Sequence, residues 1–221
     1  MRVAALYDVH AMPWALEAVL AAVEAERADA LVFGGDYLYG PYPRETVAII
    51  RSLDAEVLRG NCEDLAEEWE RDELAPGDLE WLQSLPVAVT VDGVLYCHAA
   101  PTDNTPITTV ETPEDAVRQT FAGHTGTIVI GHTHHQFDRR VGDLRIVNAG
   151  SVGMAYEGDV AAYWIMVADG VPTPMRTPFD VDKAVRETSA SGWPHAQEFV
   201  AENLLQVVTR EEAVASLESR R

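Results

Sequence analysis

Cysteine is scarce in this sequence of 221 residues, and a long apolar run is absent. The two cysteines, Cys62 and Cys97, are too few for a disulfide framework in a chain of this size, so a reducing environment is expected. No apolar stretch approaches the roughly 18 residues of a membrane-spanning helix. The first residues also lack the basic and apolar regions of a signal peptide. The sequence therefore predicts a cytoplasmic protein that does not cross a membrane.

Lysine is rarer still. Lys183 is the only one, and 16 basic residues stand against 36 acidic ones, which gives a formal net charge of −20. Such a surface repels nucleic acid and anionic membranes at long range, so neither is expected as a partner. A small phosphate-bearing substrate stays compatible with this charge, because bound metal ions would supply strong positive charge locally.

Apolar residues make up 47% of the chain, enough for one sizeable core. Strand-like runs at 3–7, 30–33 and 56–58 alternate with helical patterns, an order that builds a parallel α/β sheet. The acidic stretch from 63 to 80 predicts a helix with a solvated face. We expect one domain over 1–221, with a helical tail from about residue 179 that carries no catalytic group.

Polar side chains able to bind a cation follow several of the predicted strands. Because the carboxyl ends of parallel strands share one edge of a sheet, these side chains are expected to meet there. Each alone has a plain alternative as a core or loop residue, but a whole set at strand ends is hard to explain in that way. The candidate ligands are Asp8, His10, Asp36, Asn61, His98, His132 and His134.

These candidates comprise carboxylates, an amide and imidazoles, which suit manganese, iron or zinc better than calcium, a cation that prefers oxygen alone. A structural zinc site built on thiolates is excluded, because the chain has only two cysteines. The set is too large for one tetrahedral ion. It suits two ions about 3.5–4 Å apart that share a carboxylate.

At these positions the sequence resembles the calcineurin-like metallophosphoesterases. The family's blocks occur here in the family's order, as Asp8-Val9-His10, Gly35-Asp36, Gly60-Asn61, His98 and Gly131-His132-Thr133-His134. The turn at 148–153 is similar to one in the family's small bacterial and archaeal phosphodiesterase branch. The resemblance covers residues 3–168 or so, and it implies an α/β fold, a sandwich of two mixed β-sheets flanked by helices.

The resemblance also implies a centre with two divalent metal ions. One ion would bind Asp8, His10, Asp36 and His134. The other would bind Asp36, Asn61, His98 and His132, so that Asp36 bridges the pair. The implied activity is hydrolysis of small phosphate esters by a hydroxide that bridges the metals, most simply as a phosphodiesterase, with phosphomonoesterase activity as an option. The alternative is a non-catalytic interaction scaffold on the same fold, a role known for a vacuolar-sorting subunit of the family.

Some positions depart from the family pattern or extend it. Cys62 stands where many members have the histidine that protonates the leaving oxygen, so it is the catalytic candidate there, although the general acid stays unassigned. A cysteine hydrolase is a weaker hypothesis, because the histidines are committed to metal. Ala11 replaces a common glycine. Tyr37 and Ser151 are candidates for lining the substrate site, with a purely structural role as the alternative for each.

Overall fold

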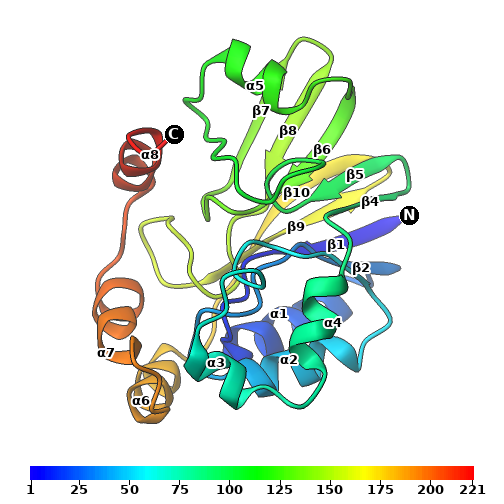
Figure 1. Ribbon diagram of the computed structural model, residues 1–221. Coiled ribbons are helices and arrows are strands. Elements are labelled where there is room, and N and C mark those ends of the chain that lie inside the picture. Colours follow the sequence, from blue (N-terminus) through cyan, green and yellow to red (C-terminus); the bar gives the residue numbers. More distant parts are fainter.

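Two five-stranded sheets pack face to face in the computed structural model, which describes residues 1–221, and helices cover their outer faces (Figure 1). The first sheet has the order β10-β9-β1-β2-β3, and the second has the order β4-β5-β6-β8-β7. Both are mixed, because β1–β2–β3 and β5–β6–β8 run parallel while the remaining pairs are antiparallel. The predicted sandwich of two mixed sheets is confirmed.

The strands of the first sheet are β1 (Arg2–Leu6), β2 (Ala30–Phe33), β3 (Glu56–Val57), β9 (Ala162–Ala168) and β10 (Val171–Thr177). Those of the second are β4 (Ala88–Val91), β5 (Val94–Cys97), β6 (Gly126–Ile130), β7 (Phe137–Val141) and β8 (Leu144–Asn148). The helices are α1 (Pro13–Ala25), α2 (Pro43–Arg51), α3 (Glu68–Glu73), α4 (Asp78–Ser84), α5 (Glu114–Thr120), α6 (Val181–Ala190), α7 (Ala196–Phe199), the π-helical η1 (Val200–Leu205) and α8 (Arg210–Glu218).

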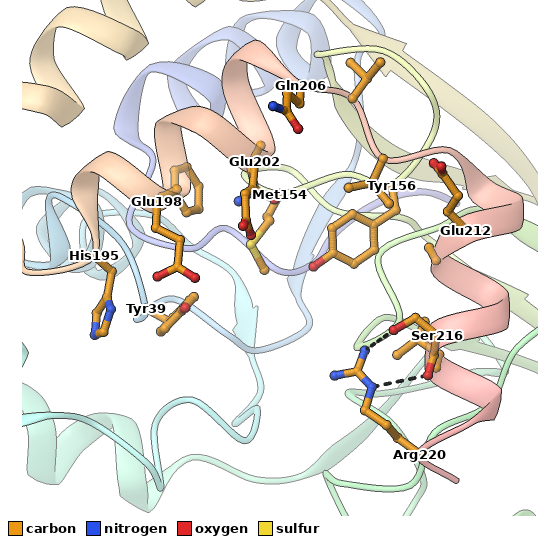
Figure 2. A pocket seen from close by; sticks show the side chains of 16 residues that line it. Tyr39, Met154, Tyr156, His195, Glu198, Glu202, Gln206, Glu212, Ser216 and Arg220 are labelled. Atoms are coloured by element: carbon orange, nitrogen blue, oxygen red, sulfur yellow. Dashed lines mark hydrogen bonds between the residues drawn. The ribbon is translucent and has the colours of Figure 1, made fainter.

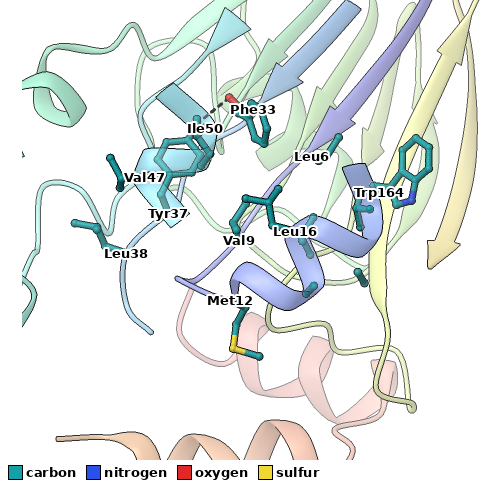
Figure 3. Packing of buried hydrophobic residues seen from close by; sticks show 14 of the residues in the cluster. Leu6, Val9, Met12, Leu16, Phe33, Tyr37, Leu38, Val47, Ile50 and Trp164 are labelled. Atoms are coloured by element: carbon teal, nitrogen blue, oxygen red, sulfur yellow. Dashed lines mark hydrogen bonds between the residues drawn. The ribbon is translucent and has the colours of Figure 1, made fainter. Parts of the chain in front are cut away.

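The alternation of side chains along β1 creates two separate cores. Val3 and Ala5 point toward the second sheet, while Ala4 and Leu6 point toward the helices. The larger core lies on the helical side, where Figure 3 shows Leu6, Leu16 and Trp164 among its members. A third core covers the outer face of the second sheet under α5. Since both faces of each sheet are buried, the loops at the strand ends are held on a rigid base.

The acidic stretch differs from the prediction of one helix over 63–80. Residues 61–67 form turns, and α3 and α4 are separate short helices. Gly77 separates them in a left-handed conformation (φ 87°) that favours glycine. The face is also not wholly solvated, because Glu70 is buried and accepts the N–H groups of Tyr39 and Glu67. Its place in the sequence did not distinguish it from the exposed glutamates around it.

Residues after Thr177 form a C-terminal arm, defined here as 178–221, that contains α6, α7, η1 and α8. In Figure 1 the arm runs along one side of the molecule, from the helices under the first sheet to the level of the second sheet. The longest helix of the chain is α1, with 13 residues, and none combines the length and apolar character that crossing a membrane requires.

Candidate metal centre

The predicted ligands converge where the parallel strands of the two sheets end. Asp8, Asp36 and Asn61 follow β1, β2 and β3 of the first sheet, while His98 and His132 follow β5 and β6 of the second. The side chains form two groups, and within each group all donor atoms lie within 4.8 Å of one another. The first consists of Asp8, His10, Asp36 and His134, and the second of Asp36, His98 and His132.

Asp36 belongs to both groups, which is the geometry that a bridging carboxylate requires. Asn61 joins the second group, because its side-chain oxygen lies 3.0 Å from Nε2 of His98. All predicted ligands therefore meet in one place. Asp8 and His98 are fully buried, and Asp36 is 2% exposed, so the charges of the carboxylates are shielded from water.

The backbone carries strain at most of these positions. Left-handed φ angles are uncommon for residues other than glycine, and they cluster at functional sites where the surrounding structure enforces them. Five of the candidate ligands adopt them: Asp8 (54°), His10 (49°), Asp36 (58°), His132 (67°) and His134 (58°). Ala11, the departure from the family's glycine, does so as well (48°). The chain thus bends sharply after β1, β2 and β6 to turn these side chains inward.

Two glycines permit the close approach of neighbouring strand ends. A Cβ atom on Gly60 would lie 2.2 Å from Oδ1 of Asp36, and one on Gly131 would lie 2.5 Å from Oδ2 of Asp8. Both distances are far below van der Waals contact. The glycines at the family's Gly-Asn and Gly-His positions are therefore required by packing against the carboxylates.

Hydrogen bonds to carbonyl groups fix the tautomers of the imidazoles in the second group. His98 donates from Nδ1 to the carbonyl of Gly34 (2.9 Å), and His132 donates from Nε2 to that of Thr105 (3.1 Å). The remaining nitrogens, Nε2 of His98 and Nδ1 of His132, face each other at 3.2 Å. Two facing lone pairs repel each other unless a proton or a metal ion lies near both. In metal-binding histidines, the ring nitrogen that does not bind the metal usually donates a hydrogen bond to a group such as a backbone carbonyl.

The first group repeats this arrangement. His10 donates from Nδ1 to the carbonyl of Leu38 (3.1 Å), which leaves its Nε2 only 3.1 Å from Nε2 of His134. Nδ1 of His134 is buried without a hydrogen-bond partner. Nε2 of His134 also lies 3.4 Å from the Asp8 carboxylate. The donor set and its tautomers therefore fit divalent cations in both groups.

The pKa values of the carboxylates and imidazoles in the two groups depend on one another. Burial raises the pKa of Asp36, but the neighbouring imidazoles of His98 and His10 outweigh burial, so that its pKa is lowered overall. Burial and a second imidazole lower the pKa of both His10 and His132 to about 4. Burial also lowers the pKa of His98, yet Asp36 and Asp8 outweigh it and raise that pKa overall. At neutral pH the cluster therefore combines carboxylates with neutral His10 and His132, which is the ligand state for metal.

Glu63 is a positioning residue that the sequence analysis did not single out. It is fully buried, and its carboxylate accepts the backbone N–H groups of Asp36 (3.0 Å), Tyr37 (2.7 Å) and Gly60 (2.7 Å). Burial and the nearby Asp36 raise its pKa to about 7. The carboxylate thus joins the loops after β2 and β3, which hold Asp36 and Asn61. The one available signal in the sequence was its place two residues after the candidate ligand Asn61; that it lies outside a helix is known only from the structure.

Tyr37 and Ser151, the candidates for lining the substrate site, are both buried, and their hydroxyl groups bond to the backbone. Tyr37 is fully buried in the core, and its hydroxyl donates to the carbonyls of Leu58 and Phe33, as Figure 3 shows for the latter. The Ser151 hydroxyl donates to the carbonyl of Asp8 (2.7 Å) and accepts the N–H of Met154. In this arrangement each hydroxyl supports a loop that carries a candidate ligand, which is the structural role named as the alternative.

Cys62 contacts the centre through its backbone. Its N–H donates to Oδ1 of Asp36 (2.9 Å), while its half-buried side chain packs against the large core. Burial, followed by the charge of Asp36, raises the pKa of the thiol well above its ordinary value. The group is thus a neutral thiol at neutral pH, which disfavours the alternative of a cysteine nucleophile.

The family model described as the calcineurin-like phosphoesterase superfamily domain matches residues 1–170, which include both donor groups. The chain belongs to this superfamily. The match ends at the start of β10, so the C-terminal arm lies outside it. No curated protein matches the sequence.

Solved structures agree with this membership of the calcineurin-like superfamily. A metallophosphoesterase from Sphaerobacter thermophilus is 26% identical, with a TM-score of 0.72, over 89% of this chain and 96% of that one. A hypothetical protein from Pyrococcus horikoshii OT3 shares the fold at 16% identity, with a TM-score of 0.75, over 91% of this chain and 98% of the other. Both alignments extend over nearly the whole of those chains.

Proposed function

We propose that this superfamily member is a metal-dependent phosphodiesterase that hydrolyses small phosphate esters in the cytoplasm. The observation that carries the proposal is the shared position of Asp36 between two groups of donor atoms whose imidazole nitrogens face each other. Bound divalent cations, of manganese, iron or zinc, would lower the pKa of a water molecule and neutralise phosphoryl oxygens. The phosphate of a substrate would lie at the outer side of the same groups.

The protein's own residues would hold the cations and fix their spacing. We assign Asp8, His10, Asp36 and His134 to one ion, and Asp36, Asn61, His98 and His132 to the other. Asp8 is oriented for this role by the N–H of His132, which lies 3.0 Å from Oδ2. Glu63 holds the loop of Asp36, and the carbonyls of Leu38 and Gly34 keep His10 and His98 in the tautomers that leave a lone pair for metal.

Hydrolysis of bis(para-nitrophenyl) phosphate tests the proposal directly. Its leaving group has a low pKa and departs without protonation, so turnover depends on the metal centre alone. We expect saturable turnover with added manganese and none after chelation. A folded, metal-loaded protein that cleaves neither this ester nor any other diester or monoester of a substrate panel would favour the scaffold role.

Metal binding is expected to stabilise the fold. In the metal-free protein the buried carboxylates of Asp8 and Asp36 lose their cationic partners. A ligand that binds only the folded state at about 100 times its Kd adds roughly 2.7 kcal/mol to the free energy of unfolding. The Tm should therefore fall after exhaustive chelation and recover with manganese or zinc, whereas calcium should restore less. An unchanged melting curve in protein shown to be free of metal would contradict the assignment.

Cys62→Ala should retain most turnover of aryl diesters. The thiol packs against the core and is uncharged at neutral pH even beside Asp36 and Asn61, so its loss removes neither a charged ligand nor a thiolate nucleophile. Its N–H, which supports Asp36, is kept in the variant. Cys62→His should improve alkyl monoesters selectively, since their leaving group benefits from an acid.

The measurement is the turnover of both ester types by wild type and both variants at equal metal content. Loss of all aryl-diester turnover in folded, metal-loaded Cys62→Ala would show that the thiol itself takes part in catalysis. A trapped phosphorylated Cys62 would point the same way.

A further inference from the structure

A cavity of about 570 Å³ lies between the C-terminal arm and the candidate metal centre. The arm forms most of its wall, from His195 in front of α7 to Arg220 after α8, and Tyr39, Met154 and Tyr156 form the rest (Figure 2). Its volume is within the range of pockets that bind small molecules. Because the family model ends at residue 170, the part of the wall that the arm forms lies outside the matched domain.

Two tyrosines place the cavity directly beside the first group of donors. The ring of Tyr39 meets that of His10 edge to face, with centroids 6.2 Å apart, and the ring of Tyr156 lies 5.0 Å from that of His134. Both tyrosines line the cavity. A phosphate held at the donor groups would therefore direct one of its ester groups toward the arm.

The arm is fastened on both sides of the centre, so the wall has a defined position. His195 at the start of α7 contacts Glu67 with Nε2 3.0 Å from the carboxylate, beside α3. Near the C-terminus, Glu218 accepts the hydroxyl of Thr109, on the loop that follows β5, at 2.6 Å. Arg210 at the start of α8 pairs with Glu157. The arm thus connects the two halves of the molecule across the cavity.

The chemistry of the lining favours a cation. Glu198, Glu202 and Glu212 line the cavity. Arg220, the one arginine of the lining, follows α8, bonds Ser216 on that helix and lies close enough to Tyr156 to affect its pKa. Figure 2 shows the Glu198 carboxylate directly above Tyr39, with His195 to one side, and the Tyr156 ring on the opposite side of Met154. Burial is the main cause that raises the pKa of both tyrosines, to about 12 for Tyr156, so both rings are neutral.

We propose that this cavity selects phosphate esters whose alcohol carries an ammonium group, held between the rings of Tyr39 and Tyr156 and the carboxylates of Glu198 and Glu202. The inference rests on the proposed phosphodiesterase function and names its substrate class. Aromatic faces together with carboxylates bind quaternary ammonium through cation–π and Coulomb attraction. An anionic group in the same place would meet the carboxylates of Glu198 and Glu202 in a protein whose net charge is already −20.

A pair of chromogenic diesters tests the selectivity. Para-nitrophenyl choline phosphate and para-nitrophenyl neohexyl phosphate differ only in a charged nitrogen in place of a carbon, and both release nitrophenol. We expect roughly a tenfold higher kcat/KM for the choline ester, carried mainly by KM, which corresponds to about 1.4 kcal/mol. Glu198→Gln with Glu202→Gln should reduce the preference to about twofold or less, mainly through a lower kcat/KM for the choline ester.

The matched control is Glu80→Gln with Glu211→Gln, which removes the same charge from exposed positions outside the cavity. It should keep the preference. Equal kcat/KM for the two esters in the wild type would overturn the inference, and so would an equal loss of preference in the control. If neither ester were cleaved, the phosphodiesterase function would fail. Calorimetric titration with choline chloride would then test the cavity by itself. Binding to the wild type that is lost in the Glu198/Glu202 variant would support the inference, and no binding to the wild type would overturn it.

Discussion

Asp36→Asn should lower kcat/KM for bis(para-nitrophenyl) phosphate by on the order of a thousandfold or more, and should do so more completely than Asn61→Ala. Asp36 belongs to both donor groups, whereas Asn61 lies beside His98 alone. The amide of the variant keeps the size of the side chain but carries no charge to attract two cations. Loss of this one group thus weakens both sites together, while Asn61→Ala leaves the first site intact.

Metal content and turnover should be measured on the same preparations. Asp36→Asn is expected to retain fewer than two ions per chain, and Asn61→Ala to regain part of its turnover at high metal concentration. The exposed Asp72→Asn on α3 is the matched control and should behave as wild type. Two tightly bound ions and near-normal turnover in Asp36→Asn would refute the shared-carboxylate assignment.

Glu63→Ala should lower the free energy of unfolding of the metal-free protein by about 3–5 kcal/mol. The substitution leaves the buried N–H groups of Asp36, Tyr37 and Gly60 without their acceptor, and it also removes a longer contact with the N–H of Leu38 (3.4 Å). Each buried donor that loses its acceptor costs about 1–3 kcal/mol. The loops that carry Asp36 and Asn61 would also lose their common anchor, so metal affinity should fall even though Glu63 contacts no metal.

Urea unfolding and metal titration of the chelated protein separate these two effects. The exposed Glu68→Ala, five residues further along the chain, is the control and should change stability by less than about 0.5 kcal/mol. Glu63→Gln keeps an oxygen for one or two of the N–H groups and should lie between wild type and Glu63→Ala. A stability loss of Glu63→Ala as small as that of the control would show that the three hydrogen bonds matter little.

The sequence was sufficient to predict the candidate ligands at the strand ends, but not the residues that hold the loops of these ligands in place. Ligand side chains such as Asp8 and His132 stand beside apolar runs and glycines, so a local pattern reveals them. The roles of Glu63 and Glu70 depend on N–H groups that are distant in the chain, and Glu70 is indistinguishable in sequence from its exposed neighbours. The hydrogen bonds of Tyr37 are hidden for the same reason, because its partners become apparent only when β2 and β3 are paired.

The loop from Tyr37 to Tyr42 shows that residues of one type, close together in the sequence, can have different structural roles. Of three tyrosines within six positions, Tyr37 belongs to the core, Tyr39 lines the cavity and Tyr42 packs on Trp14. Tyr39 has a left-handed φ of 61°, and its side chain points away from the core that contains Tyr37 and Leu38. No local pattern predicts this angle for a bulky residue. The arm that completes the cavity was likewise predicted only as a helical tail.

The division of the donor groups between two sheets has a consequence for how the protein matures. Asp8, His10, Asp36 and Asn61 precede β4, whereas His98, His132 and His134 belong to the second sheet and are synthesised later. Neither half alone presents a complete set of donors for either ion. A nascent chain therefore cannot capture metal at full affinity until both sheets have formed and docked. Binding of metal by a complete donor group is therefore expected only after the second sheet has formed, and a fragment that ends before His132 should bind metal weakly.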